Sequence, residues 1–210
     1  MKNSQEKIDL TLIIPTFERH FIIKRLSTFY ENKPYKVLIL DGSKNSINHK
    51  FASNVRYIWS GNTYEERLRS SLKYIDTKYV CMIGDDEFHF LESLKESIVF
   101  LEKNNQFSSC SGFPISHYSY SFSGIKKLTD FDSFFSSRLA KTPYKFENKC
   151  YSNSSERRFR YHYEEYQPRF VYSVTRIEIW KAAMDTIQAA TQEIKALGLY
   201  ELSIDSAIFA

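Results

Sequence analysis

Leu10-Thr11-Leu12-Ile13-Ile14, followed by Pro15, is the stretch from which the fold of this chain can be read. A continuous apolar run of this length is typical of a strand buried on both faces of a parallel sheet. Pro15 has no backbone N–H to donate to a neighbouring strand, so we expect the strand to end there. Apolar residues then recur at helical spacing from Ile22 to Tyr30, and Asn32–Pro34 ends that helix.

Three further strands are predicted: a buried one at residues 36–40, an alternating one at 55–59 and a fourth at 79–83. Thr63 and Glu66 form the sequence signature of a capping box, which predicts a helix start between the third and fourth strands. Another helix is expected from about residue 91 to residue 101. Strands that alternate with helices pair mostly in parallel, through right-handed crossovers. We therefore predict an α/β fold, a Rossmann-like three-layer sandwich with a mostly parallel central sheet.

The second half of the chain has a less regular pattern. We expect a strand at 108–117 with a bend at Pro114, a loop over 141–167, a strand at 170–174 and helices at 176–188 and 199–210. The last helix has no terminal Gly or Pro, so a truncated C-terminus is one expectation. No internal repeat or linker divides the sequence, and a length of 210 residues fits one domain, residues 1–210.

Composition and charge exclude several classes of protein. The net charge is only +4 and the charges are mixed along the chain, so we expect no nucleic-acid partner. No apolar run approaches the ~20 residues of a membrane span, and Met1–Lys7 is too polar for a signal peptide. Cys81, Cys110 and Cys150 are scattered and odd in number, which predicts reduced, structural thiols. We therefore expect a cytoplasmic protein, with peripheral attachment at the inner face of the membrane left open.

Polar clusters follow the predicted parallel strands, at Thr16–Arg19, Asp41–Ser43, Ser60–Asn62 and Asp85–Glu87. In open α/β sheets, ligands bind outside the carboxyl ends of the strands. The coincidence of these clusters with strand ends carries more weight than any one of them. It predicts a ligand site at that edge of the sheet.

Asp85, Asp86 and Glu87 are the strongest chemical signal in the chain. Three adjacent carboxylates repel one another, and a divalent cation removes that conflict. Mg²⁺ or Mn²⁺ takes one or two protein carboxylates and fills its other positions with water and phosphate oxygens. We therefore predict these three residues as ligands of Mn²⁺ or Mg²⁺. The alternative is a solvated acidic turn that caps the following helix.

Other residues have weaker individual signals. Asp41 could accept a hydrogen bond from a nucleotide base or ribose, or it could close an Asx turn. Arg67 could reach a phosphate, or pair with a neighbouring glutamate on the helix surface. Four late acids are candidates for the base that accepts a hydroxyl proton in a group transfer: Glu164, Glu165, Glu201 and Asp205.

Leu12–Arg19, Leu38–Ser43 and Tyr79–Phe88 resemble three segments of family 2 glycosyltransferases, in this order and spacing. These segments are the opening strand, the strand with the nucleotide-binding Asp, and the DXD-type segment. The resemblance covers roughly residues 10–105. It implies a GT-A fold, a nucleoside diphosphate sugar donor, Mn²⁺ or Mg²⁺, a glycan or lipid-linked acceptor and an inverting transfer. It also implies a nucleotide-sugar-binding half, about 8–105, and an acceptor-side half, about 106–210.

By matching position, the resemblance implies which residues contact the donor. These are Pro15, Thr16, Glu18, Asp41, Arg67, Asp85 and Asp86. Asp85, Asp86 and Glu87 would hold the metal. The resemblance does not identify the base that accepts the proton, for which we choose Glu201, with Asp205 and Glu165 as alternatives. Three features depart from the family. Glu87 replaces the more usual Asp, Arg67 has different neighbours from the arginine often found there, and the late Glu-Asp motif that often carries the base is not evident.

Other functions remain open from the sequence. A sugar nucleotidyltransferase would release pyrophosphate, and we would expect a more glycine-rich and basic opening loop than Thr16–Arg19. A catalytically silent subunit with the same fold would bind glycans or a partner enzyme. A phosphoacceptor signalling domain also carries acids at its strand ends, but it gives the aromatic-rich second half no role.

Overall fold

The computed structural model describes residues 6–112, 115–118, 138–141, 153–154, 156–157, 160 and 172–196. The chain forms two compact units, one of Met1–Gly112 with Ser152–Ala210 and one of Phe113–Tyr151. In the smaller unit, β6 (Ile115–Tyr118) pairs with β7 (Arg138–Lys141) in an antiparallel ribbon. The larger unit holds the central sheet and the candidate site.

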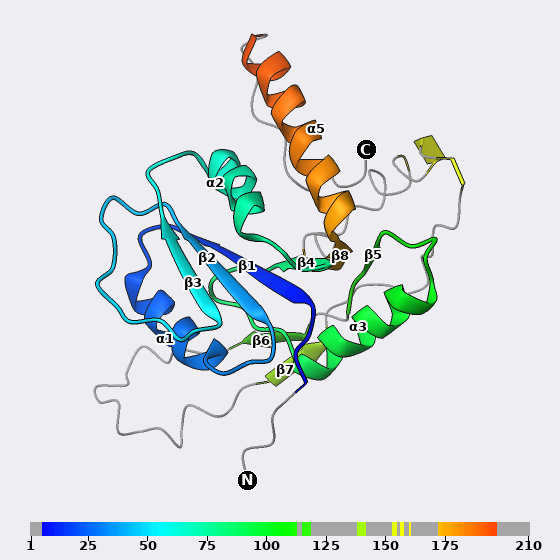
Figure 1. Ribbon diagram of the computed structural model, residues 1–210. Helices are drawn as coiled ribbons and strands as arrows, with labels where there is room; N and C mark the ends of the chain where they lie inside the picture. The colour runs from blue at the N-terminus through cyan, green and yellow to red at the C-terminus, as the bar shows by residue number, and fades with distance from the viewer. Residues whose placement is uncertain are drawn as a thin grey trace. The chain divides into compact units, whose positions relative to one another are not determined.

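The central sheet has six strands in the order β3-β2-β1-β4-β8-β5. Their bounds are β1 (Leu10–Thr16), β2 (Lys36–Asp41), β3 (Val55–Trp59), β4 (Tyr79–Met82), β5 (Ser109–Cys110) and β8 (Val174–Arg176). β1 pairs in parallel with both β2 and β4, and β2 pairs in parallel with β3. β8 is antiparallel to both of its neighbours. The predicted α/β fold with a mostly parallel central sheet is confirmed (Figure 1).

Helices cover both faces of the sheet (Figure 1). They are α1 (His20–Tyr30) and α3 (Leu91–Lys103) on one face, and α2 (Tyr64–Ser71) and α5 (Ile177–Ala196) on the other. Successive residues of β1 point to opposite faces, as in any strand. Leu12 and Ile14 therefore pack with α1 and α3. Ile13 instead packs with Leu68 of α2 and Trp180 of α5. Within the described ranges, no helix is both long and apolar enough to cross a membrane.

The start of α2 follows the predicted capping box. The Glu66 backbone N–H donates to the Thr63 hydroxyl at 3.3 Å, and the Glu66 carboxylate accepts from the Thr63 N–H at 3.1 Å. These bonds satisfy two N–H groups that a helix end would otherwise leave unpaired. The helix ends at Ser71, and a short 3₁₀ turn, η1 (Leu72–Tyr74), follows it.

The expectation that β1 ends before Pro15 is wrong, because the strand continues to Thr16. The Thr16 carbonyl accepts a bond from the Gly42 N–H on the β2 side. Backbone groups alternate in direction along a strand, so the missing N–H of Pro15 lies on the β4 side. β4 has already ended there, at Met82, and the proline therefore removes no ladder bond.

Three other predictions in the second half differ from the structure. The strand expected at 170–174 begins only at Val174 and is β8. The single strand expected at 108–117 is divided between β5 in the central sheet and β6 in the small ribbon. The helix expected at 176–188 continues to Ala196. The helix expected at 199–210 and most of the loop expected at 141–167 lie outside the described residues.

We predict that Leu68→Ala lowers the free energy of unfolding by about 2–5 kcal/mol, because it opens a cavity between α2, α5 and the sheet. Urea denaturation followed by circular dichroism measures this change. Val99→Ala is the matched control: Val99 is 49% exposed, so its loss should cost less than about 0.5 kcal/mol. Equal effects of the two substitutions would contradict the assigned core.

Candidate functional site

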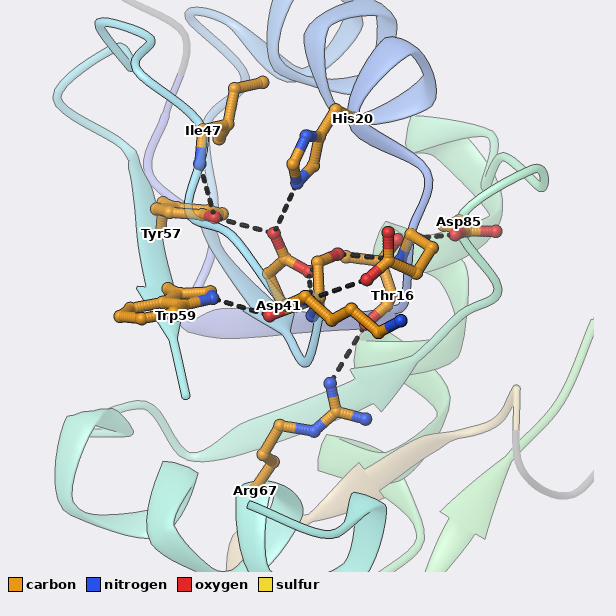
Figure 2. Close-up of polar contacts among 11 residues, drawn as sticks. Thr16, His20, Asp41, Ile47, Tyr57, Trp59, Arg67 and Asp85 are labelled. Atoms are coloured by element: carbon orange, nitrogen blue, oxygen red, sulfur yellow. Dashed lines mark hydrogen bonds and ion pairs between the residues drawn. The ribbon is translucent and has the colours of Figure 1, made fainter. Parts of the chain in front are cut away.

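The ends of the parallel strands meet at one edge of the central sheet. In the register of the sheet, Thr16 of β1 pairs with Asp41 of β2, and Asp41 pairs with Trp59 of β3. Asp85 follows β4, and the Thr16 hydroxyl donates to it at 2.7 Å. Figure 2 shows these side chains grouped at the strand ends. Parallel pairing thus brings together residues that are up to 69 positions apart in the chain.

Asp41 is fully buried, and its carboxylate is bound entirely by the protein's own groups. The Ser43 N–H donates at 2.8 Å and the Ser43 hydroxyl donates to the same oxygen. The Tyr57 hydroxyl donates to the other oxygen at 2.6 Å. A buried carboxylate needs such donors because it has lost its water. Asp41 therefore orders the ends of β2 and β3, and direct contact with a nucleotide stays a prediction.

His20, Tyr57 and Trp59 were not singled out from the sequence, yet they surround Asp41 (Figure 2). His20 Nε2 lies 3.6 Å from Asp41 Oδ2, and it is buried with no hydrogen-bond partner among the described residues. Burial, and then the bond to Asp41, raises the pKa of Tyr57 to about 12, so this hydroxyl remains a donor. Trp59 is 47% exposed, and its indole N–H donates to the Ser43 carbonyl at 2.7 Å.

Asp85 joins β1 to the loop after β4. Its side chain is 8% exposed, and its two oxygens accept from the Thr16 hydroxyl and from Arg19 Nη1, at 2.7 and 2.6 Å. The same Arg19 nitrogen lies 3.2 Å from Asp86. The pKa of Arg19 is raised by its hydrogen bond to Asp85 and by the two negative charges. Arg19 therefore acts as the cation that balances this acidic pair.

The acids predicted to hold a metal do not converge on one point. Asp85 faces Arg19, whereas Glu87 Oε2 accepts a 3.1 Å bond from the Gly84 N–H. Asp86 keeps a 59% exposed side chain. Within the described part of the chain, no three His, Cys, Asp or Glu side chains are arranged to hold a metal ion. The oxygen ligands that these side chains offer still fit Mn²⁺ or Mg²⁺. Exposed carboxylates such as those of Asp86 and Glu87 can bind an ion together with the phosphates of a ligand.

Arg67 lies beneath the strand ends rather than on the surface of α2. It is 7% exposed, and its Nη1 donates to the Thr16 carbonyl at 3.0 Å. Burial lowers the pKa of its guanidinium, although the nearby charge of Asp41 opposes that shift. The guanidinium packs directly on Gly42: a Cβ at this position would lie 1.7 Å from Arg67 Nη1. Arg67 thus supports the loop after β2, and phosphate contact stays a prediction.

Glu18 joins the loop after β1 to the loop after β2 by two hydrogen bonds. Its N–H donates to the Ser43 hydroxyl at 2.7 Å, and its carboxylate accepts from the Lys44 N–H at 2.7 Å. Its φ of 55° is in the left-handed region, where a residue other than glycine is strained. Two bonds across the loops therefore hold an unfavourable backbone conformation next to the strand ends.

His89 points into the core, away from the carboxylates that precede it. Its Nε2 lies 3.2 Å from the buried Cys81 thiol, and burial lowers its pKa to about 4. Burial also raises the pKa of Cys81, so both groups are neutral near pH 7. Cys81 and Cys110 are free thiols. Cys150 and the predicted catalytic acids Glu165, Glu201 and Asp205 lie outside the described residues.

No model of a protein family matches this chain, and no curated protein matches it significantly. Among solved structures, S. aureus TarS 1–349 is 12% identical over 96% of this chain and 54% of its own, with a TM-score of 0.49. A second S. aureus TarS structure is 17% identical over 50% and 21%, with a TM-score of 0.38. The mannosyltransferase PcManGT from Pyrobaculum calidifontis, in complex with GDP-Man and Mn²⁺, is 12% identical over 51% and 36%, with a TM-score of 0.39.

This chain therefore spans about half, or less, of the length of each of these solved chains. Sequence identities of 12–17% do not show which residues of the site correspond.

We predict that Gly42→Ala lowers the free energy of unfolding by about 1–3 kcal/mol, because the added methyl displaces the Arg67 guanidinium from the Thr16 carbonyl. The measurement is the urea midpoint with an unchanged slope. Gly61→Ala is the matched control, since nothing lies within 4 Å of a Cβ there. A Gly42→Ala variant as stable as Gly61→Ala would refute the packing of Arg67 on Gly42.

Proposed function

We propose that this chain carries the donor site of a glycosyltransferase, which moves a sugar from a nucleoside diphosphate sugar to an acceptor hydroxyl. The observation that carries the proposal is the junction of Thr16, Arg19 and Asp85 at the strand ends, beside Asp41. Ligands of α/β sheets bind at this edge. A half-exposed arginine next to exposed carboxylates suits a diphosphate that arrives with a divalent cation.

Arg19 and Trp59 would contact the donor directly. Only Nη1 of Arg19 is used by the two aspartates, and its side chain is 46% exposed, so other N–H groups remain to meet a phosphate. The Trp59 ring is fixed by its bond to the Ser43 carbonyl and is half-exposed at the end of β3. A fixed aromatic face of this kind is suited to stacking on a nucleobase.

Asp86, with Glu87, would hold Mn²⁺ or Mg²⁺. The ion would neutralise the charge on the leaving nucleoside diphosphate. Asp85 is assigned a positioning role, because its oxygens already hold Thr16 and Arg19 in place. For Asp86 to turn toward an ion, its 3.2 Å contact with Arg19 must open. The phosphate of an incoming donor would replace Asp86 as the partner of Arg19.

In the proposed reaction, the acceptor hydroxyl oxygen forms a bond to the anomeric carbon while the bond from that carbon to the diphosphate oxygen breaks. A carboxylate takes the hydroxyl proton, and an in-line displacement inverts the anomeric configuration. Glu201, Asp205 and Glu165 stay the predicted candidates for this base. The acceptor class stays a glycan or a lipid-linked sugar, as the family resemblance implies.

A second candidate function is a catalytically silent subunit that binds a glycan or a partner enzyme. The Arg19 contacts with Asp85 and Asp86 favour it, because a fixed cation already balances the acids that a metal would otherwise bridge. Such a subunit would consume no donor. A nucleotidyltransferase would instead release pyrophosphate, so the identity of the phosphate product separates the three functions.

We predict that wild-type protein with Mn²⁺ releases a nucleoside diphosphate from one nucleoside diphosphate sugar in a panel, and that Asp86→Asn slows this release by at least about 10- to 100-fold. Nucleoside diphosphate is detected in these reactions, and pyrophosphate is detected in parallel reactions that contain nucleoside triphosphates and a sugar 1-phosphate. Asp76→Asn is the matched control, because Asp76 is an exposed acid paired with Lys36, at the start of β2 and away from the strand ends. Pyrophosphate release, or no release from folded protein, would contradict the proposal.

A further inference from the structure

The outer face of α1 exposes large aromatic side chains beside basic ones. Phe21, Arg25 and Phe29 recur at every fourth position, so they lie along one stripe of the helix. Phe21 is 75% exposed and Phe29 is 40% exposed. The opposite face of α1 supplies the core through Ile23 and Leu26, and neither Phe21 nor Phe29 belongs to the buried core cluster.

The stripe continues onto the loop that follows β4. The centre of the Phe88 ring lies 4.4 Å from the centre of the Phe29 ring, and Phe88 is 40% exposed. The Arg25 guanidinium lies 5.5 Å from the centre of the Phe88 ring, and the Lys33 ammonium lies 4.7 Å from the centre of the Phe29 ring. We call Phe21, Arg25, Phe29, Lys33 and Phe88 the α1 patch. Its rings and cations share one stripe of the surface, and exposed aromatic side chains gathered in this way are typical of an interaction site.

The charge of the patch selects the kind of partner. The exposed residues of α1 are Phe21, Lys24, Arg25, Thr28 and Phe29, and the charged ones are both basic. The nearest acids along the chain are Glu31, which follows the end of the helix, and Glu87, which precedes Phe88, and the cations Lys24, Arg25 and Lys33 outnumber them. Exposed phenylalanine with lysine and arginine is the composition of surfaces that lie in the headgroup region of anionic membranes. The partner should therefore be negatively charged and have an apolar layer below its charges.

We propose that the α1 patch docks this protein on an anionic lipid bilayer. Phe21 enters the boundary between headgroups and acyl chains, while Lys24, Arg25 and Lys33 meet lipid phosphates. This binding does not depend on the proposed function. If that function holds, docking would place the candidate site near acceptors held in the bilayer. The reason is that α1 begins at His20, whose Nε2 lies 3.6 Å from Asp41 Oδ2.

Vesicle co-sedimentation of the full chain tests the proposal. The probes are vesicles of phosphatidylcholine alone and of phosphatidylcholine mixed with phosphatidylglycerol. We expect binding to the mixed vesicles only, with affinity reduced about tenfold by Phe21→Ser and at least about fivefold by Arg25→Glu. The controls are Arg69→Glu on α2 and Phe100→Ser on α3, exposed positions outside the patch, which should change affinity by less than about twofold.

Each other outcome overturns the proposal. Folded wild-type protein that leaves mixed vesicles unbound would show that the patch is not a lipid surface. Equal binding to neutral vesicles would remove the role of charge, and equal losses in the control variants would show nonspecific adsorption. A patch-dependent dimer in light scattering, without vesicle binding, would assign the surface to a second copy of this chain. Melting temperatures of all variants establish that they are folded, independently of any nucleotide or transfer assay.

Discussion

The parallel pairing of β1 with strands on both of its sides is the constraint on which the rest of the structure depends. It fixes Thr16 beside Asp41 on one side and brings Asp85 within hydrogen-bond reach on the other. Because both neighbours run in the same direction as β1, their following loops share one edge of the sheet. Residues from loops that are distant in the sequence can then form one polar cluster.

The two buried acids of this cluster are stabilised in different ways. Asp41 is satisfied by neutral donors, Ser43 and Tyr57, which fasten β2 to β3. Asp85 is satisfied by Thr16 and by the half-exposed Arg19, so its environment remains open to solvent on one side. A buried charge without such partners would be strongly destabilising. Asp41 therefore maintains the shape of the edge, whereas Arg19 and the exposed acids next to Asp85 are the groups that a ligand can reach.

The sequence predicted the parallel strands, the capping box and the place of Thr16, Asp41 and Asp85 at the carboxyl ends of the strands. Apolar runs and strand ends are local signals, so they can be recognised in the sequence. It could not predict the partners of those residues. Tyr57 and Arg67 look like ordinary strand and helix positions, and their contacts with Asp41 and Thr16 depend on tertiary packing. The extension of β1 through Pro15 likewise depends on where β4 ends. The exposed face of α1 carried no signal, since its phenylalanines fit the same helical pattern as core residues.

The central claim is that this edge binds a nucleoside diphosphate together with a divalent cation. Thermal unfolding with UDP, GDP, CDP and TDP, each in Mn²⁺ and in EDTA, tests it most directly. A ligand at a hundredfold excess over its dissociation constant adds about 2.7 kcal/mol of stability. The account predicts that one nucleotide raises the melting temperature in Mn²⁺ and that EDTA removes the shift. A folded protein whose melting temperature responds to none of the four nucleotides would contradict it.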